Sequence, residues 1–195
     1  MVLKCEKKIC QNEKKENYVG KGLERGDIMF EKGDYIVYGS SGVCEVKDVG
    51  PMEMTGVKEG KLYYTLKQRY SEGGTIFTPV DNCKIVMRGV YSKGEAGELI
   101  ETIPFIEELK IQDERKREEF YKDSLRTCDF TEFIRLIKLI YHRKKRRLEA
   151  GKKMASLDER YLKMAEDGLY GELEVSLEMS RDDVEKLVSE RLDVD

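Results

Sequence analysis

The sequence predicts an α+β protein in which a small antiparallel β-barrel of the Tudor or SH3-like kind precedes an all-α helical domain. Two observations predict this class. Between residues 29 and 90, short runs of β-type residues alternate with turn-forming segments rich in glycine. From residue 113 onward, apolar residues recur with the period of a helix. Short strands about ten residues apart are typical of a small barrel, and the change of period marks a change of structural class.

The expected strands of the barrel are runs of apolar and β-branched residues, and turn-forming residues separate them. These runs are residues 35–38, 43–49, 62–66, 75–80 and 84–87. The intervening turns are Ser40-Ser41-Gly42, Glu59-Gly60, Ser71-Glu72-Gly73-Gly74 and Asp81-Asn82. Pro79 cannot donate a ladder hydrogen bond, so we expect it on an edge strand or at a bulge.

The second half of the chain predicts helices. Residues 95–102 have a helical pattern that Pro104 ends. Three pairs with the spacing of capping residues divide the remainder, namely Asp129 with Glu132, Ser156 with Glu159, and Ser180 with Asp183. We therefore expect helices at 113–127, 130–149, 157–178 and 181–192. The second of these has an apolar stripe made of Phe130, Phe133, Ile134, Ile137, Ile140, Tyr141 and Leu148.

The predicted strands and helices divide the chain into four parts. Residues 29–92 form the barrel, residues 93–112 connect it to the helices, and residues 113–195 form the helical domain. Residues 1–28 are polar and precede the first strand. We expect them to be a disordered arm or the product of a start site assigned too far upstream.

Composition predicts a soluble, cytoplasmic protein without a metal or cofactor, and we expect a monomer. Apolar residues make up 39% of the 195 residues, and no apolar run approaches the ~18 residues of a membrane span. The first 28 residues lack the apolar core of a signal peptide. The five cysteines, scattered without a C-x-x-C pair, and the single histidine do not have the spacing of a zinc site. The cysteines are Cys5, Cys10, Cys44, Cys83 and Cys128.

The sequence contains no catalytic constellation, so we do not expect an enzyme. The only histidine, His142, lies among the basic residues 143–147 and has no obvious carboxylate to orient it. Residues 94–98 contain two glycines but lack the lysine of a phosphate-binding loop. A nuclease would need acidic ligands that converge on a metal, which a structure can test.

The charge distribution favours a nucleic-acid partner. The net charge is −3 overall, but residues 103–153 carry +5 and residues 154–195 carry −8. On a helix, Arg135, Lys138, His142, Lys145 and Arg146 would form one ridge opposite the apolar stripe. Such a ridge can follow a phosphate backbone without reading bases. The residues expected to bind DNA are Arg115, Arg117, Lys122, Arg143, Lys144, Lys145, Arg146, Arg147, Lys152 and Lys153.

Several segments resemble the CarD/CdnL family of bacterial transcription regulators, in order and at matching spacing across about residues 29–178. These segments are Met29-Phe30-Glu31-Lys32-Gly33-Asp34-Tyr35-Ile36-Val37-Tyr38 with Gly42-Val43, Tyr64-Thr65-Leu66-Lys67, Phe77-Thr78-Pro79-Val80-Asp81-Asn82 and Leu169-Tyr170-Gly171-Glu172-Leu173. The resemblance implies a Tudor-like barrel that binds the RNA polymerase β subunit. It also implies a helical domain that binds promoter DNA at the upstream edge of the transcription bubble and alters open-complex stability without catalysis.

The resemblance also locates the residues expected to contact the polymerase. An open barrel has an edge strand that can recruit a partner strand, here Val49 to Glu53 or Thr75 to Thr78. The polymerase-contacting arginines of some family members fall near Met52 and Phe77. The expected contacts are Val49, Met52, Glu53, Ile76, Phe77 and Thr78.

One family feature is missing from this chain. Well-studied members insert a Trp at the DNA fork from the start of the first DNA-facing helix, and this chain has no Trp. Depending on the alignment, that position is Glu114 or Arg117. A second hypothesis from a different functional class stays open, in which the barrel and helices form a protein–protein adaptor that does not contact DNA. Salt-dependent DNA binding distinguishes the two hypotheses.

Overall fold

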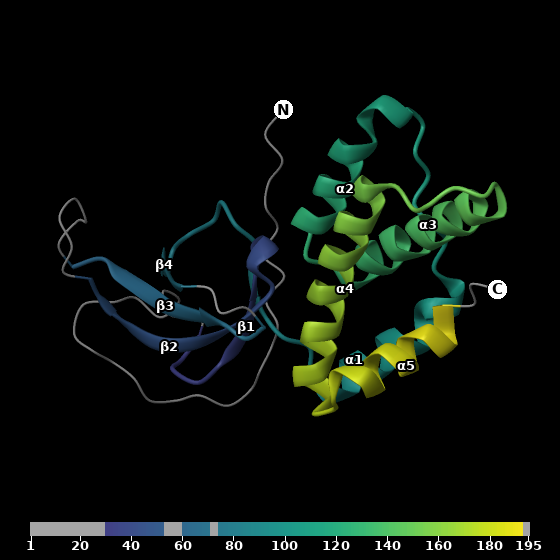
Figure 1. The fold of residues 1–195 in the computed structure, drawn as a ribbon. Helices are drawn as coiled ribbons and strands as arrows, with labels where there is room; N and C mark the ends of the chain where they lie inside the picture. Colours follow the sequence, from purple (N-terminus) through teal and green to yellow (C-terminus); the bar gives the residue numbers. More distant parts are fainter. Residues whose placement is uncertain (1–29, 53–59, 71–73, 193–195) are drawn as a thin grey trace.

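The described residues form a five-stranded sheet and five α-helices, and the sheet and the helices lie side by side (Figure 1). The computed structural model describes residues 30–52, 60–70 and 74–192. We call the part built from the strands the barrel and the part built from the helices the helical part. The predicted α+β class, with a small antiparallel β domain followed by helices, is confirmed. Residues 1–28, expected to lie outside the barrel, fall outside the described residues.

The strands form one antiparallel sheet in the order β4-β3-β2-β1-β5. Their bounds are β1 Tyr35–Tyr38, β2 Val43–Pro51, β3 Leu62–Gln68, β4 Thr75–Pro79 and β5 Met87–Gly89. Four strands lie where the sequence predicts them, whereas the fifth lies further along the chain than residues 84–87. There the backbone of residues 87–89 pairs with β1, and Ile85 and Val86 precede the strand as exposed side chains.

The barrel core lies on one face of the sheet. Ile36, Val46, Tyr64 and Leu66 are fully buried there. The register between β2 and β3 shifts between Val46 and Asp48, which is the signature of a β-bulge. Bulges increase local twist, so this one helps the sheet to curl around its core.

The helices begin and end close to the predicted residues. They are α1 Lys93–Thr102, α2 Arg117–Arg126, α3 Phe130–Glu149, α4 Ser156–Leu177 and α5 Arg181–Leu192. Asp129 caps α3 by accepting a hydrogen bond from the Glu132 backbone N–H, as the capping pair predicts. The prediction for Ser156 is wrong, because this residue is already the first of α4 and its predecessor makes no side-chain cap.

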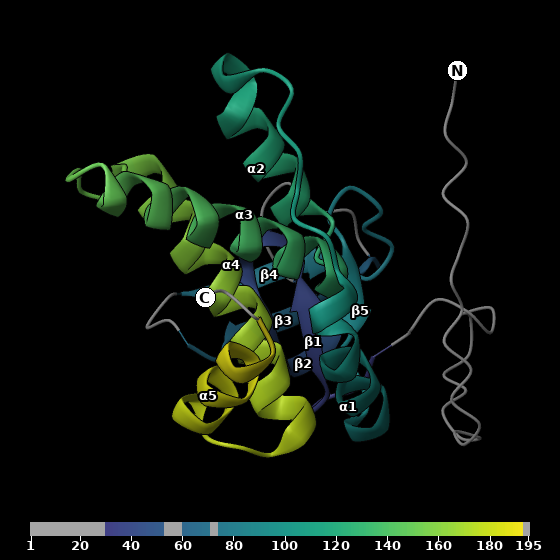
Figure 2. The same ribbon diagram turned by 90° about the vertical axis from the view of Figure 1, so that its right-hand side faces the viewer.

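One apolar core joins all five helices. Residues of α1, α2, α3, α4 and α5 share this core, including Ala96, Tyr121, Ile134, Leu173 and Val188. The segment that we expected to connect the two parts thus contains a helix that packs into the helical core. Viewed from the helical side, the helices lie in front of the sheet (Figure 2). Of the helices that the structure describes, none combines the length and apolar composition that a membrane span requires.

Two residues of α3 differ from the predicted amphipathic pattern. Leu148, expected in the apolar stripe, is 56% exposed, because it lies in the last turn of α3. Lys138, expected in the basic ridge, is only 7% exposed. Its Nζ donates hydrogen bonds to the carbonyl oxygens of Ile103 and Ile106, at 2.7 and 2.9 Å, so it fastens the chain after α1 onto α3.

Candidate functional site: a strand edge and a basic helix end

The first candidate surface is the edge of the sheet at β4. Within the described residues, β4 pairs with β3 only, and Pro79 lies on this edge as its missing N–H predicts. Phe77 is a large apolar side chain that is 49% exposed, and Ile76 beside it is half-buried. An edge strand with an exposed aromatic side chain offers both unpaired backbone groups and an apolar contact to a partner strand.

Thr78 differs from its neighbours on β4. Its side chain is buried, and its hydroxyl accepts a hydrogen bond of 2.8 Å from the side-chain amide of Asn82. Asn82 also donates to the hydroxyl of Tyr38 at 3.4 Å. Thr78 therefore holds the turn after β4 in place, and a partner would meet its backbone and not its side chain.

The second half of β2 offers an alternative edge. The pairing of β2 with β1 covers residues 43–45, and the Val46 backbone then bonds to Gly33 and Asp34. From Asp48 to Pro51, β2 pairs with β3 alone among the described residues. Val49 and Met52 are half-buried along this stretch, and Glu53 lies outside the described residues. Within the part of the chain that the structure describes, both edges that the sequence left open thus pair with β3 on one side only.

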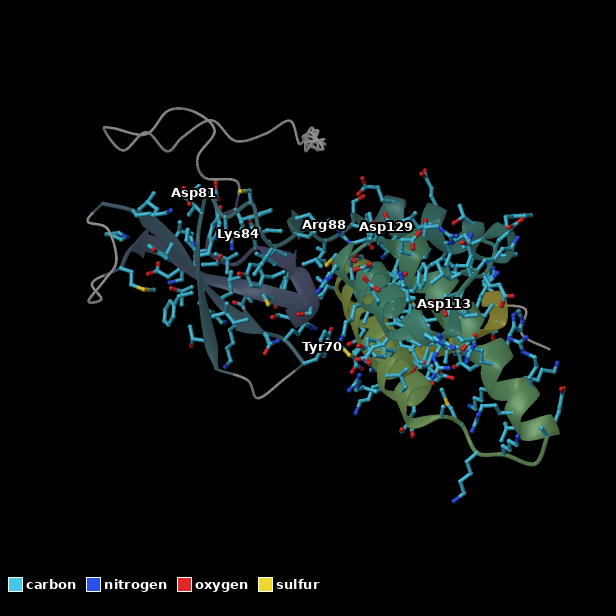
Figure 3. The ribbon with its side chains drawn as sticks, turned by 90° about the horizontal axis from the view of Figure 1, so that it is seen from above. Tyr70, Asp81, Lys84, Arg88, Asp113 and Asp129 are labelled. Atoms are coloured by element: carbon cyan, nitrogen blue, oxygen red, sulfur yellow. The ribbon has the colours of Figure 1, made fainter. Side chains whose placement is uncertain are left out.

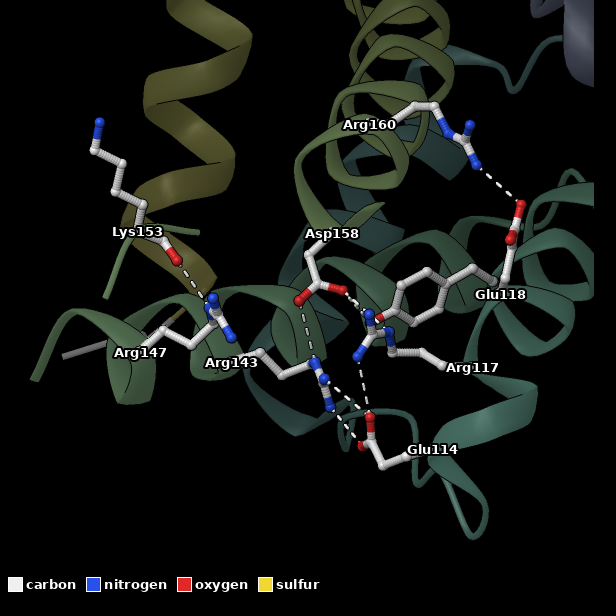
Figure 4. A network of polar contacts seen from close by, with 9 residues as sticks. Glu114, Arg117, Glu118, Arg143, Arg147, Lys153, Asp158 and Arg160 are labelled. Atoms are coloured by element: carbon white, nitrogen blue, oxygen red, sulfur yellow. Dashed lines mark hydrogen bonds and ion pairs between the residues drawn. The ribbon is translucent and has the colours of Figure 1, made fainter. Parts of the chain in front are cut away.

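The second candidate surface is the C-terminal end of α3 with the loop that follows it. We call it the basic end, and it comprises Lys144, Lys145, Arg146, Arg147, Lys152 and Lys153. Gly151 ends the helix with φ 68°, a conformation that glycine adopts without strain. Arg147 Nε donates to the carbonyl oxygen of Lys153 at 2.8 Å, so the loop folds back along the helix (Figure 4).

The basic end leaves several cations available for an anionic partner. Lys145, Arg146, Lys152 and Lys153 are exposed, and none of them makes an ion pair with a described residue. Lys144 lies with its ammonium 5.6 Å from the centre of the Tyr141 ring. Exposed cations without carboxylate partners can exchange their counterions for phosphates, which is the source of salt-dependent DNA binding.

Two of the expected DNA contacts, Arg117 and Arg143, instead belong to an internal ionic cluster (Figure 4). Arg143 donates from both Nη atoms to Glu114, at 2.7 and 3.0 Å, and from Nε to Asp158 at 3.3 Å. Arg117 donates to Glu114 at 3.1 Å, and its Nε lies 3.4 Å from Asp158. Asp158 is 1% exposed and also accepts a hydrogen bond from Tyr121. The cluster therefore joins α2, α3 and α4.

The pKa values in this cluster follow from these contacts. The hydrogen bonds from Arg143 lower the pKa of Glu114, and they also raise the pKa of Arg143. Burial and the neighbouring Asp158 raise the pKa of the Tyr121 hydroxyl, which therefore stays protonated and donates. Glu114 and Arg143 are both charged over a wide pH range.

The positions that align with the family's Trp lie in the same cluster. Glu114 and Arg117 bond to each other and to residues of other helices. Neither side chain has the apolar surface that a wedge between bases requires. At both positions where the resemblance places the wedge, this chain has charged groups that hold the start of α2 against α3 and α4.

The remaining expected DNA contacts lie near this cluster, Lys122 on α2 and Arg115 in the single 3-10 turn Glu114–Lys116 before it. Lys122 pairs with Glu118 at 3.1 Å, and Arg115 is exposed without a partner among the described side chains. Glu118 also accepts a hydrogen bond from Arg160 of α4 at 2.9 Å. The hydrogen bond from Lys122 is the main reason why the pKa of Glu118 is lowered.

The expectation that His142 lacks an orienting carboxylate is wrong. His142 Nδ1 lies 2.6 Å from Glu108 Oε2. Sequence reasoning missed this pair and the pairs of Glu114 and Asp158 with Arg143, because the partners are 34, 29 and 15 residues apart in the chain. The Glu114–Arg117 and Glu118–Lys122 pairs do have a local signal, since their residues are three and four apart in the chain.

The structure offers no grouping of residues suited to a metal within the described ranges. No three His, Cys, Asp or Glu side chains converge there. Burial raises the pKa of the Cys44 thiol to about 11 and also raises that of Cys128, so both are poor nucleophiles and poor metal ligands.

Comparison with known proteins supports the resemblance. Residues 30–91 match the family model described as the CarD-like/TRCF RID domain. This domain is the RNA polymerase-interacting domain shared by CarD-like proteins and the transcription-repair coupling factor. The match covers β1 to β5, so it confirms the resemblance for the barrel. No curated protein matches the chain in sequence.

Proposed function

Because residues 30–91 form a CarD-like/TRCF RID domain, we propose that this protein is a non-enzymatic transcription regulator that binds the RNA polymerase β subunit through its barrel. The helical part binds promoter DNA near the upstream edge of the transcription bubble, largely without sequence preference, and alters the lifetime of the open complex. The observation that carries the proposal is the match of the barrel to an RNA polymerase-interacting domain.

The open edge at β4 supports the barrel's part in this proposal. Backbone hydrogen bonds from an added strand provide affinity, and the exposed ring of Phe77 adds apolar contact next to them. The second half of β2, near Val49 and Met52, is the alternative docking edge. We favour β4 because its large exposed aromatic side chain has no counterpart on the described part of β2.

The basic end supports DNA contact by the helical part. Its exposed lysines and Arg146 can each meet a phosphate, and each such contact gives a slope of about −0.9 in log K against log salt on duplex DNA. Nothing in this surface resembles base recognition. We therefore expect weak binding by the protein alone, with the polymerase supplying most of the affinity and the position on the promoter.

The test of the proposal is capture of RNA polymerase by the full chain and by two matched variants. Phe77→Asp places a charge at the β4 edge, and Ile85→Asp places one on a similarly exposed side chain before β5. We expect Phe77→Asp to abolish capture and Ile85→Asp to leave it unchanged. If Val49→Asp abolished capture and Phe77→Asp did not, the polymerase contact would lie on β2 and not on β4.

The helical part is tested by measuring how long open complexes survive with and without the protein. A change in their lifetime that disappears on removing Lys145 and Arg146 supports the DNA contact. The adaptor hypothesis would be favoured if the protein captures polymerase but removing Lys145 and Arg146 changes neither DNA binding nor the lifetime of open complexes.

A further inference from the structure

The barrel and the helical part are joined by an ion pair that is shielded from water. Arg88 lies in β5, at the junction of the two parts (Figure 3). Its partner Glu172 lies in α4. Arg88 donates to both carboxylate oxygens of Glu172, with an Nη2–Oε2 distance of 2.8 Å. The side chain of Glu172 is only 3% exposed. A bidentate pair of this kind fixes both the distance and the relative orientation of the groups that it joins.

Arg88 and Glu172 also form hydrogen bonds with two further segments of the chain, one at Cys128 and one at Tyr91. Arg88 Nε and Nη2 donate to the carbonyl oxygen of Cys128, at 3.2 and 2.6 Å, in the turn between α2 and α3. The Tyr91 backbone N–H donates to Glu172 at 3.2 Å, and the guanidinium of Arg88 lies 4.4 Å from the centre of the Tyr91 ring. One arginine of the barrel thus contacts two separate segments of the helical part.

A second contact lies one residue away on α4. The hydroxyl of Tyr70, from the barrel, donates to the carbonyl oxygen of Gly171 at 3.3 Å. A Cβ atom at Gly171 would come within 2.9 Å of the Tyr70 ring, so a side chain at residue 171 would require the ring to shift from this contact. Burial raises the pKa of Tyr70 to about 12, which keeps its hydroxyl protonated as the donor.

An apolar contact and a short connection complete the junction. Val37 and Val43 of the barrel pack with Cys128, and Val175 of α4 lies against them.

The chain between β5 and α1 has contacts at each residue. Val90 packs against the apolar contact, Tyr91 bonds to Glu172, and Ser92 forms the capping box of α1 with Glu95. No freely rotating linker therefore separates the two parts.

We propose that Arg88, Gly171 and Glu172 hold the barrel and the helical part as one rigid body. In the regulator they are positioning residues, because they set the distance and angle between the polymerase-binding edge and the basic end. Adjacent domains usually move relative to one another unless their interface prevents it. A fixed orientation raises the effective concentration of the second surface at its site once the first is bound. The role in regulation rests on the proposed function, whereas the rigid orientation does not.

The orientation is tested by measuring the distance distribution between two spin labels by pulsed electron paramagnetic resonance. One label is placed on Cys83, which is exposed on the barrel, and the other on Lys186→Cys in α5. Cys5 and Cys10 are replaced by serine. Cys44 and Cys128 are buried with raised thiol pKa values, so they react slowly with the label.

Two variants loosen the junction in different ways. Glu172→Gln keeps the shape of the side chain but removes its charge, and Gly171→Ala inserts a methyl group against the Tyr70 ring. Alanine also favours the helix more than glycine does, so α4 should stay folded. Glu101→Gln is the control, because it breaks the Glu101–Arg191 pair, which lies within the helical part. We expect a narrow distribution for the unaltered chain and the control, and a broad or shifted one for the two variants combined.

An unchanged, narrow distribution in the double variant would overturn the inference, as would a broad distribution in the unaltered chain. The second readout uses polymerase and promoter DNA. We expect the double variant to be captured by polymerase like the unaltered chain but to lose its effect on open-complex lifetime by about tenfold or more. A full effect despite a broadened distribution would overturn the positioning role. If the unaltered chain itself has no effect on open complexes, the proposed function fails, and the distance measurement still decides whether the body is rigid.

Discussion

Arg143 and Glu114 are joined by two hydrogen bonds, of 2.7 and 3.0 Å, so a cation expected to contact phosphates is neutralised within the protein. The pair separates the predicted DNA contacts into two groups. Arg117 and Arg143 hold helices together, whereas the exposed cations of the basic end have no carboxylate partner among the described residues.

Replacing Lys145 and Arg146 with alanine should weaken binding to every duplex by a similar factor. If both contact phosphates, the slope of log K against log salt should flatten by up to about two units. Both side chains are exposed, so the fold should persist. The measurement is a salt titration of filter binding. Lys163→Ala with Lys186→Ala, which removes the same charge from α4 and α5, is the control, and an equal loss in that variant would contradict a local contact.

Replacing Glu114 with glutamine should strengthen DNA binding. The change removes the carboxylate that pairs with the Nη atoms of Arg143 and Arg117. The buried carboxylate of Asp158 still lies beside the Nε atoms of both arginines. We expect the salt slope to steepen by about one unit. Glu119→Gln is the matched control, since Glu119 is an exposed carboxylate on α2. The same gain in both variants would mean that general charge, and not release of the two arginines, is responsible.

Glu114 should also affect how the stability of the folded protein falls as the pH is lowered. Its pKa in the folded protein lies below the ordinary value of 4.5, chiefly because Arg143 donates to it. Its stabilising contribution is therefore present above the unfolded pKa and is lost as the pH falls through the lowered folded pKa. Melting temperatures between pH 3 and 7 should fall less steeply toward acid for Glu114→Gln than for the unaltered chain. Parallel curves would contradict this assignment.

Replacing Lys138 with methionine should destabilise the helical part. The variant leaves the carbonyl oxygens of Ile103 and Ile106 without the Lys138 donor, which should cost about 1–3 kcal/mol. The measurement is the free energy of unfolding from urea titrations. Lys144→Met on the same helix is the control and should change this free energy by less than about 0.5 kcal/mol. A neutral Lys138→Met would show that water replaces the lost donor.

The sequence predicted the helices and most strands because their signals are local. Alternation, turn residues and capping pairs act within a few residues, so α3 begins at the residue after its predicted cap, Asp129. Lys138 shows where this reasoning fails. Its spacing places it on the polar face of α3, but the chain at Ile103 and Ile106 covers that face, and no local pattern indicates the cover.

The candidate site was predictable only in outline for the same reason. The clustering of positive charge around residues 143–147 is visible in the sequence, whereas the carboxylates that occupy Arg143 come from other helices. Pro79 is a local signal that predicted an edge strand or a bulge at this place, but the sequence left β4 and the second half of β2 as alternative docking edges. The contacts of Glu172 lie within a segment that the sequence singled out, but their role depends on Arg88, which is 84 residues away in the chain.

The distance in sequence between Arg88 and Glu172 has a consequence for synthesis of the protein. The ribosome completes β5 before any of the helices, and it must add another 84 residues before the partner of Arg88 exists. At a synthesis rate of ~5–20 residues per second, this interval lasts roughly 4–17 seconds. Throughout it the barrel has strands β1 to β5, but Arg88 lacks its carboxylate partner, and the carbonyl oxygen of Cys128 is added 40 residues after Arg88. The bidentate pair between the two parts can therefore form only after this stretch of α4 has been synthesised.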